Sequence, residues 1–263
     1  MLIAALPMYD WPEERAQVDR RWAVLRDRMR SAGIAAPDAL VRRNADMPAV
    51  PGGIRAADGT ILAPDPASLP PDGFDLAVLW RHPALLFAET CWGPLAHGLA
   101  PHVTVVGQSD YGPFEGGAGP DYCSAIVARR ADGLAAAPSA DGRAVLPLEL
   151  FRGRVLAFNE PHSMSGYMGL RRDLTAEGPG MDLFGGHRAT GAHRASIRAV
   201  AEGQADFAAI DCRSWFLARQ HEPAAQDLHV VGWTARSPGI PYIRAAALDP
   251  ATAARLGHVM AQH

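Results

Sequence analysis

The chain has 263 residues, of which 48% are hydrophobic and 20% charged, so it can fill one large or two small globular cores. Its formal net charge of −3 argues against a surface for nucleic acid or for an anionic membrane. All 25 basic residues are arginines, and the absence of lysine excludes Schiff-base, pyridoxal-phosphate and P-loop chemistry.

The 3 cysteines, Cys91, Cys123 and Cys212, are odd in number, widely spaced and adjacent to apolar runs. We therefore expect buried free thiols, with no metal site, no disulfide framework and no cofactor. No apolar run is long enough to span a membrane, and Asp10 interrupts the N-terminus before a signal-peptide core can form. A cytoplasmic location, and export by a segment outside this numbering, both stay open.

The first part of the chain alternates between strand and helix signals. Residues 2–8 are predicted to form a strand, and Asp10, followed by a proline and two glutamates, is typical of a helix cap. A helix is expected after Asp10, and its helically spaced apolar residues end at Gly33. A short strand is expected at 39–43, and 44–73 is predicted to be irregular because it is rich in proline and glycine.

The rest of the chain continues this alternation, except that residues 74–80 fit a helix or a strand equally well. Further strands are expected at 84–89, 103–106, 122–128, 155–158, 205–210 and 228–233. Further helices are expected at 94–99, 167–174, 195–202, 215–219 and 246–262. The alternation predicts an α/β fold with mostly parallel sheets.

The segment 154–174 contains the clearest candidate site. Its strand is followed by Asn-Glu-Pro, then by Ser163-Met164-Ser165-Gly166 and a helix. A helix start with two hydroxyl groups can bind an anion. Simple capping by Ser163 or Ser165 is the alternative, because serine before a helix is usually a cap.

Other candidates also follow predicted strands, where open α/β sheets bind ligands. They are Tyr9, Asp10, Thr90, Trp92, Thr190, His193 and Asp211, with Tyr122 at the start of its strand. For Tyr9 and Tyr122 the alternative is core packing, and for Asp10 it is capping. His193 is either a neutral donor to an anion or a helix cap. Asp211 either caps the next helix, or pairs with Arg213, or binds the ammonium group of a ligand.

Several segments together resemble a known family. They are L-P-M-Y-D-W-P-E (6–13), the run W-R-H-P to W-G-P-L (80–95), Y-C-S-A-I-V (122–127), S-M-S-G-Y (163–167), the run T-G-A-H to A-A-I-D (190–211), and S-P-G-I-P-Y (237–242). With these motifs the chain resembles the phosphate, phosphite and phosphonate substrate-binding proteins of ABC transporters, which have the type II periplasmic-binding-protein fold.

The resemblance implies two lobes, each with a sheet flanked by helices, that close on a ligand cleft by hinge motion. The expected first lobe is 1–110 and 228–263, the second is 111–227, and the hinge crossings lie near 107–121 and 212–228. The resemblance further implies a monomer, a periplasmic location and an ABC permease as partner.

The resemblance also assigns roles at the site. It implies oxyanion contacts from Ser163, Ser165 and the backbone around Gly166, a donor at His193, and Asp211 at the far end of the ligand. Tyr122 would contribute from the lobe junction, and Tyr9 from the opposite lobe. The chain departs from the family pattern at two positions. Met164 replaces the usual threonine, and Trp92 is bulkier than the residue that many relatives have at this position.

We therefore expect a solute-binding protein, not an enzyme, for a small phosphonate-like anion or zwitterion. Trp92 and Tyr9 could enclose the organic portion of the ligand. Two alternatives remain. One is a cytosolic ligand-sensing module, and the other is an enzyme that uses Cys91 or Cys212 with His193 on a vitamin precursor or phosphorylated metabolite.

Overall fold

The computed structural model describes residues 1–130 and 134–262, and the chain divides into two compact units. Unit 1 comprises Met1–Gln108 and Ile240–His263, and unit 2 comprises Ser109–Gly239. Among the described residues, no helix combines the length and the apolar character needed to cross a membrane.

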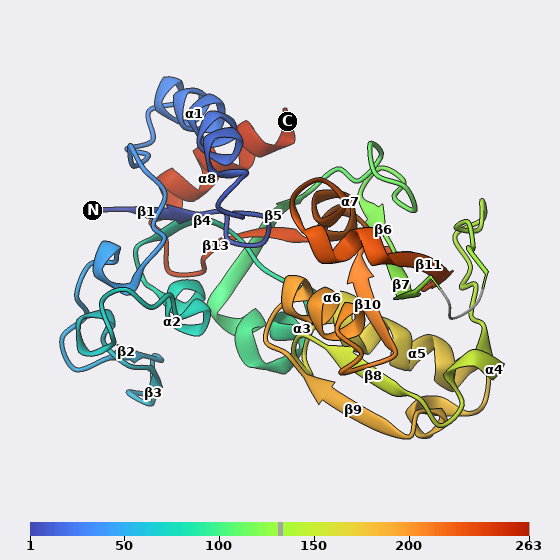
Figure 1. The fold of residues 1–263 in the computed structure, drawn as a ribbon. Coiled ribbons are helices and arrows are strands. Elements are labelled where there is room, and N and C mark those ends of the chain that lie inside the picture. The colour runs from blue at the N-terminus through green and yellow to red at the C-terminus, as the bar shows by residue number, and fades with distance from the viewer. Residues whose placement is uncertain (131–133, 263) are drawn as a thin grey trace. The chain divides into compact units, whose positions relative to one another are not determined.

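Unit 1 contains a four-stranded sheet in the order β1-β4-β13-β5 (Figure 1). Its strands are β1 (Ile3–Ala5), β4 (Leu85–Glu89), β5 (Val103–Gln108) and β13 (Pro241–Ala245), with a separate hairpin of β2 (Ile54–Arg55) and β3 (Ile61–Ala63). Its helices are α1 (Arg15–Ser31), α2 (Leu76–Arg81), α3 (Trp92–Pro94) and α8 (Pro250–Ala261).

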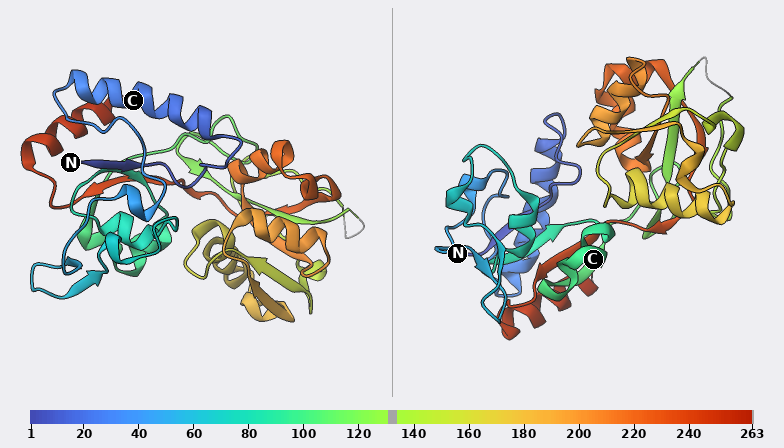
Figure 2. Two further views of the ribbon diagram at one scale, coloured as in Figure 1. Left: turned by 60° about the vertical axis from the view of Figure 1, so that its left-hand side comes forward. Right: turned by 90° about the horizontal axis from the view of Figure 1, so that it is seen from below.

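The two faces of this sheet are covered by different helices. On one face α1 and α8 lie side by side, and Trp22, Met29 and Leu256 pack against Ala4 and Phe87 (Figures 1 and 2). The other face packs against α2 through its buried valine and leucine side chains. The sheet is therefore buried on both sides, which explains the near-continuous apolar sequence of β4.

Unit 2 contains a five-stranded sheet in the order β11-β7-β10-β8-β9 (Figure 1). Its strands are β7 (Ser124–Arg129), β8 (Val155–Phe158), β9 (Gly186–Ala189), β10 (Phe207–Asp211) and β11 (Leu228–Trp233), with a separate ribbon of β6 (Asp121–Tyr122) and β12 (Ser237–Pro238). Its helices are α4 (Leu148–Phe151), α5 (Gly169–Ala176), α6 (His193–Ala201) and α7 (Cys212–His221).

Two expectations about the architecture need correction. The sheets are mixed and not mostly parallel, because β13 runs antiparallel to β4 and β5, and β7 runs antiparallel to β10 and β11. This follows from the connectivity, since β5 leads out of unit 1 and β13 brings the chain back beside it.

The second crossing also lies later in the chain than expected. The sequence expectation places residues 228–239 in the first lobe, but β11 pairs with β7 inside unit 2 from Leu228 to Trp233. The chain therefore passes from unit 2 to unit 1 between Gly239 and Ile240, and not near 212–228.

Local predictions failed where a distant partner intervened. Helix α1 begins at Arg15, and Asp10 does not cap it, because both carboxylate oxygens of Asp10 accept hydrogen bonds from Arg42 at 2.6 and 3.0 Å. The expected strand at 39–43 is not formed. Within 74–80, which is undecided from sequence, residues 76–80 lie in α2, and Asp75 is its N-cap, whose carboxylate accepts from the Val78 N–H at 3.0 Å.

Candidate functional site

The strand, turn and helix predicted around Ser163 are present in unit 2. Strand β8 ends at Phe158, and Ser163 is the N-cap of a π-helical turn, Met164–Met168, that continues into α5. The Ser163 Oγ accepts a hydrogen bond from the Gly166 N–H at 3.0 Å. The capping interpretation of Ser163 is therefore correct, and capping leaves its hydroxyl hydrogen available to another acceptor.

Gly166 is required at this turn by its neighbour Asn159. A β-carbon at residue 166 would overlap the Oδ1 of Asn159 and would lie 3.2 Å from the Ser163 Oγ. The Asn159 Oδ1 is buried and has no hydrogen-bond partner in the structure. The carboxamide is thus held against the helix start, and only glycine leaves room for it.

Ser165, His193 and Asp211 come together from three elements. Ser165 lies in the π-helical turn, His193 is the first residue of α6, and Asp211 ends β10. The Ser165 Oγ is 2.9 Å from the His193 Nε2, and the same nitrogen is 3.4 Å from the Asp211 Oδ2. Asp211 also caps α7, accepting from the Ser214 N–H at 2.9 Å.

Burial keeps the His193 ring neutral. Desolvation lowers the pKa of His193 below its usual value, and the nearby Asp211 carboxylate only partly opposes this shift. Because a carboxylate faces Nε2, the favoured tautomer of the neutral ring carries its hydrogen on Nε2. Ser165 then accepts from this N–H, and its own hydroxyl hydrogen is free to be donated.

In this tautomer both serine hydroxyls accept a hydrogen bond from a protein N–H group and keep their own hydrogen for another acceptor. The Gly166 N–H occupies the acceptor side of the Ser163 hydroxyl, and the Nε2–H of this His193 tautomer does the same for the Ser165 hydroxyl. The two Oγ atoms are 3.5 Å apart. Since each hydroxyl can donate outward, the pair forms a compact donor set next to a helix start, which is the chemistry an oxyanion requires.

The start of α6 adds to this arrangement. Its N-cap residue, Ala192, provides no side-chain hydrogen bond to the helix. The helix dipole is positive at this end of α6, where its first-turn N–H groups lie. Thr190, in contrast, is committed to the structure, because its Oγ1 contacts the Ser196 Oγ at 2.6 Å and the Phe158 carbonyl at 3.0 Å.

The remaining candidates of unit 2 are Tyr122 and Met164. Tyr122 is 3% exposed, and its ring lies 5.1 Å from that of Tyr111, so the packing role that had been an alternative is present. Met164 is the first residue of the π-helical turn and is partly exposed.

In unit 1, three candidates follow the adjacent parallel strands β1 and β4. Tyr9 and Thr90 are buried, and Trp92 packs partly buried against the core. The Thr90 Oγ1 is buried without a hydrogen-bond partner. The turn before Tyr9 is held to the end of β4, because the Met8 N–H donates to the Glu89 carboxylate at 3.1 Å.

Glu89 and Asn159 were missed by sequence reasoning. Glu89 is fully buried, and its carboxylate pairs with Arg21 of α1 at 2.7 Å. Asn159 directly follows β8, so the rule that ligand residues follow strands could have selected it. The partner of Glu89 comes from a helix 68 residues away, and no local pattern signals it.

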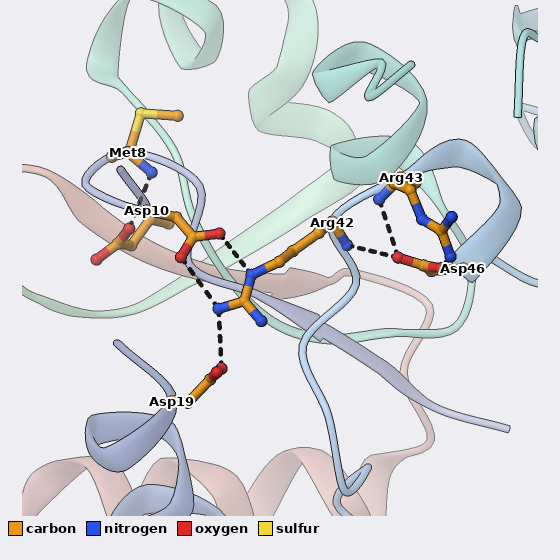
Figure 3. Close-up of polar contacts among 7 residues, drawn as sticks. Met8, Asp10, Asp19, Arg42, Arg43 and Asp46 are labelled. Carbon is orange, nitrogen blue, oxygen red and sulfur yellow. Dashed lines mark hydrogen bonds and ion pairs between the residues drawn. The ribbon is translucent and has the colours of Figure 1, made fainter. Parts of the chain in front are cut away.

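A cluster of arginines and aspartates in unit 1 does not qualify as an anion site. Arg42 pairs with Asp10 and with Asp19, and the carboxylate of Asp46 accepts from the backbone N–H groups of Arg42 and Arg43 (Figure 3). A surface cavity of about 930 Å³ adjoins these arginines. The carboxylates already neutralise Arg42 and Arg43, so the two arginines are not available to an anionic ligand. Their ion pairs instead hold residues 39–46 in place.

The structure also weighs against a cysteine nucleophile. Burial raises the pKa of the Cys212 thiol, and it raises the pKa of Cys123 to about 12, so neither forms a thiolate at neutral pH. Among the described residues, no cluster of histidine, cysteine and acidic side chains could hold a metal ion.

Solved structures resemble the whole chain at low sequence identity, which establishes the fold. PhnD1 from Prochlorococcus marinus (MIT 9301), in complex with methylphosphonate, has a TM-score of 0.62 and 16% identity over 98% of this chain and 82% of that one. The binding-protein component of an ABC phosphonate transporter (PA3383) from Pseudomonas aeruginosa has a TM-score of 0.59 and 16% identity, covering 97% and 72% of the respective chains.

A third structure, XAC2383 from Xanthomonas citri bound to ATP, has a TM-score of 0.58 and 17% identity, covering 99% of this chain and 82% of that one. The expected two-lobed type II periplasmic-binding-protein fold is therefore confirmed. No curated protein sequence matches the chain.

A protein-family match covers residues 97–262, which is more than half of the chain. Proteins of this family capture a small-molecule ligand and deliver it to a permease, and they are not enzymes. The chain therefore belongs to the family of periplasmic substrate-binding proteins of phosphonate ABC transporters.

Proposed function

We propose that the chain binds a small phosphonate-like oxyanion at the donor set formed by Ser163, Ser165 and His193. The observation that carries this proposal is the polarity of the two serine hydroxyls. The Ser163 hydroxyl accepts from the Gly166 N–H, and with the ring hydrogen of His193 on Nε2 the Ser165 hydroxyl accepts from that N–H, so each presents a hydrogen to the ligand. The backbone around Gly166 and the first turn of α6 supply further N–H groups.

The proposal gives the neighbouring residues defined roles. Asp211 holds the His193 tautomer and, in a zwitterionic ligand, faces the ammonium group. Tyr9, Thr90, Trp92, Tyr122 and Met164 contact the organic portion. The protein acts as a monomer that closes by hinge motion at the two crossings, and an ABC permease receives the ligand.

Thermal-shift assays with methylphosphonate, aminoethylphosphonate, phosphite, phosphate and methanesulfonate test this function. A ligand at 100 times its dissociation constant stabilises the protein by about 2.7 kcal/mol, which raises Tm by roughly 2–4 °C per kcal/mol in a chain of this size. ATP belongs in the panel, because one similar structure contains it. A shift with ATP and not with phosphonates would replace the proposed ligand class.

Ser165→Ala is the decisive variant, with calorimetry as the readout. Losing one donor to a charged group costs about 1.5–3 kcal/mol, so the dissociation constant for the shifting phosphonate rises about 10- to 100-fold. Ser31→Ala, at an exposed position ending α1, is the matched control and leaves the affinity unchanged. Unaltered affinity in Ser165→Ala would refute the assigned site.

A further inference from the structure

Cys123 and Cys212 lie opposite each other at the end of an antiparallel ladder in unit 2. Strand β10 pairs with β7 in a register that ends with Asp211 opposite Ser124. Cys123 directly precedes β7, Cys212 directly follows β10 as the first residue of α7, and the Cys212 N–H donates to the Cys123 carbonyl at 3.1 Å. The hydrogen bond shows that the pairing continues for one more residue.

The Cα spacing of this pairing suits a disulfide. Directly opposite residues in an antiparallel ladder have Cα atoms about 4.5–5.5 Å apart, within the range of about 4.4–6.8 Å that a disulfide spans. The Cys123 Sγ now contacts the Gly116 carbonyl at 3.2 Å, so bond formation requires rotation of this side chain about χ1.

We propose that Cys123 and Cys212 form a disulfide when the chain folds in the presence of a disulfide oxidant. A thiolate of one cysteine attacks the oxidant, RSSR, forming a mixed disulfide and releasing one RS⁻. The second cysteine then attacks the protein sulfur of the mixed disulfide and releases the other RS⁻. Two protein thiols and RSSR thus become one protein disulfide and two RSH.

Burial decides when this reaction occurs. Cys123 is 4% exposed and Cys212 is 2% exposed, so an oxidant does not reach them in the folded protein. Their raised thiol pKa values act in the same direction, because the thiolate is the nucleophile. The bond therefore forms during folding, as in an oxidising compartment, and the folded protein retains whichever redox state it acquired.

The disulfide would stabilise the part of unit 2 that carries Asp211. Cys212 begins α7 directly after Asp211, and Cys123 separates Tyr122 from β7. The bond closes a loop of about 90 residues, and long loops gain most from cross-linking. We expect the oxidised protein to unfold at least about 5 °C higher than the reduced protein.

The test uses the full chain carrying Cys91→Ser, which removes the third thiol. The protein is denatured and reduced, and it is then refolded with oxidised and reduced glutathione. The expected product has lost two hydrogen atoms in its intact mass, has no titratable thiol after denaturation, and yields a Cys123–Cys212 cross-linked peptide. The folded, reduced protein incubated with the same glutathione mixture keeps both thiols.

Three results would overturn the proposal. They are a refolded protein that keeps both thiols, one that contains only glutathione adducts, and, in the chain with Cys91 intact, a cross-link that involves Cys91. Cys123→Ala, which cannot form the bond, is the control for the difference in Tm. If the variant gains as much Tm under oxidising refolding as the protein with both cysteines, the stabilisation does not come from this disulfide.

Discussion

Gly166→Ala is the sharpest test of how the helix start is built. In an ordinary helix this substitution stabilises a protein by about 1 kcal/mol. At residue 166 the new β-carbon would overlap the Asn159 Oδ1 and would crowd the Ser163 Oγ at 3.2 Å. Overpacking of this kind costs about 1–3 kcal/mol. The expected fall in Tm is therefore roughly 2–12 °C, at 2–4 °C per kcal/mol.

Ligand binding should suffer together with stability. The β-carbon displaces the N–H group that now donates to Ser163, so we expect at least about a tenfold weaker affinity for the phosphonate, equivalent to about 1.4 kcal/mol. Thermal unfolding and calorimetry measure the two effects. Gly257→Ala is the matched control, because this glycine lies within α8 with open space around it, and the substitution there should stabilise the protein.

A second substitution separates the clash from other causes. Asn159→Ala removes the overlapping carboxamide, and its Oδ1 has no hydrogen bond to lose. The double variant should recover most of the stability lost in Gly166→Ala, with a coupling energy of about 1 kcal/mol or more. The reasoning is refuted if Gly166→Ala is as stable as the parent protein, or if Asn159→Ala restores nothing.

Two further predictions concern charge. Burial lowers the pKa values of His193 and His82, so the unfolded chain takes up protons before the folded protein does, and stability should fall as pH drops below about 6.5. His193→Asn should reduce this slope in Tm measured between pH 7.5 and 5, and an unchanged slope would mean that His193 is not buried as neutral imidazole. Arg42→Gln should leave phosphonate affinity within about twofold, because Asp10 and Asp19 already neutralise this arginine, whereas a large loss of affinity in calorimetry would place the anion beside Arg42.

Local sequence signals predicted the parts of the fold that depend on neighbouring residues. The strand before Asn159, the serine cap and the helix after it are all present, because caps, turns and apolar runs act over a few residues. The glycine predicted to end the first helix does so with a positive φ of 77°. The capping role of Asp211 was also an alternative from sequence, and it is present.

Predictions failed where long-range pairing outweighed a local preference. Asp10 has the sequence context of a cap, but a fork of two hydrogen bonds from Arg42, 32 residues away, holds its carboxylate. Residues 228–233 were correctly predicted as a strand and assigned to the wrong lobe, because an apolar strand fits either sheet. Pairing with a specific neighbouring strand, and not the composition of residues 228–233, decides which sheet this strand joins.

The α/β class, the helix start at Ser163 and the family resemblance follow from the amino-acid sequence, because each depends on short motifs. The meeting of Ser165, His193 and Asp211 depends on the fold, since these residues follow or end β8, β9 and β10, which are neighbours in the strand order of unit 2. The fold also sets the partner of each serine hydroxyl. Hydrogen-bond direction depends on which partner lies within about 3 Å, and that distance is set by packing.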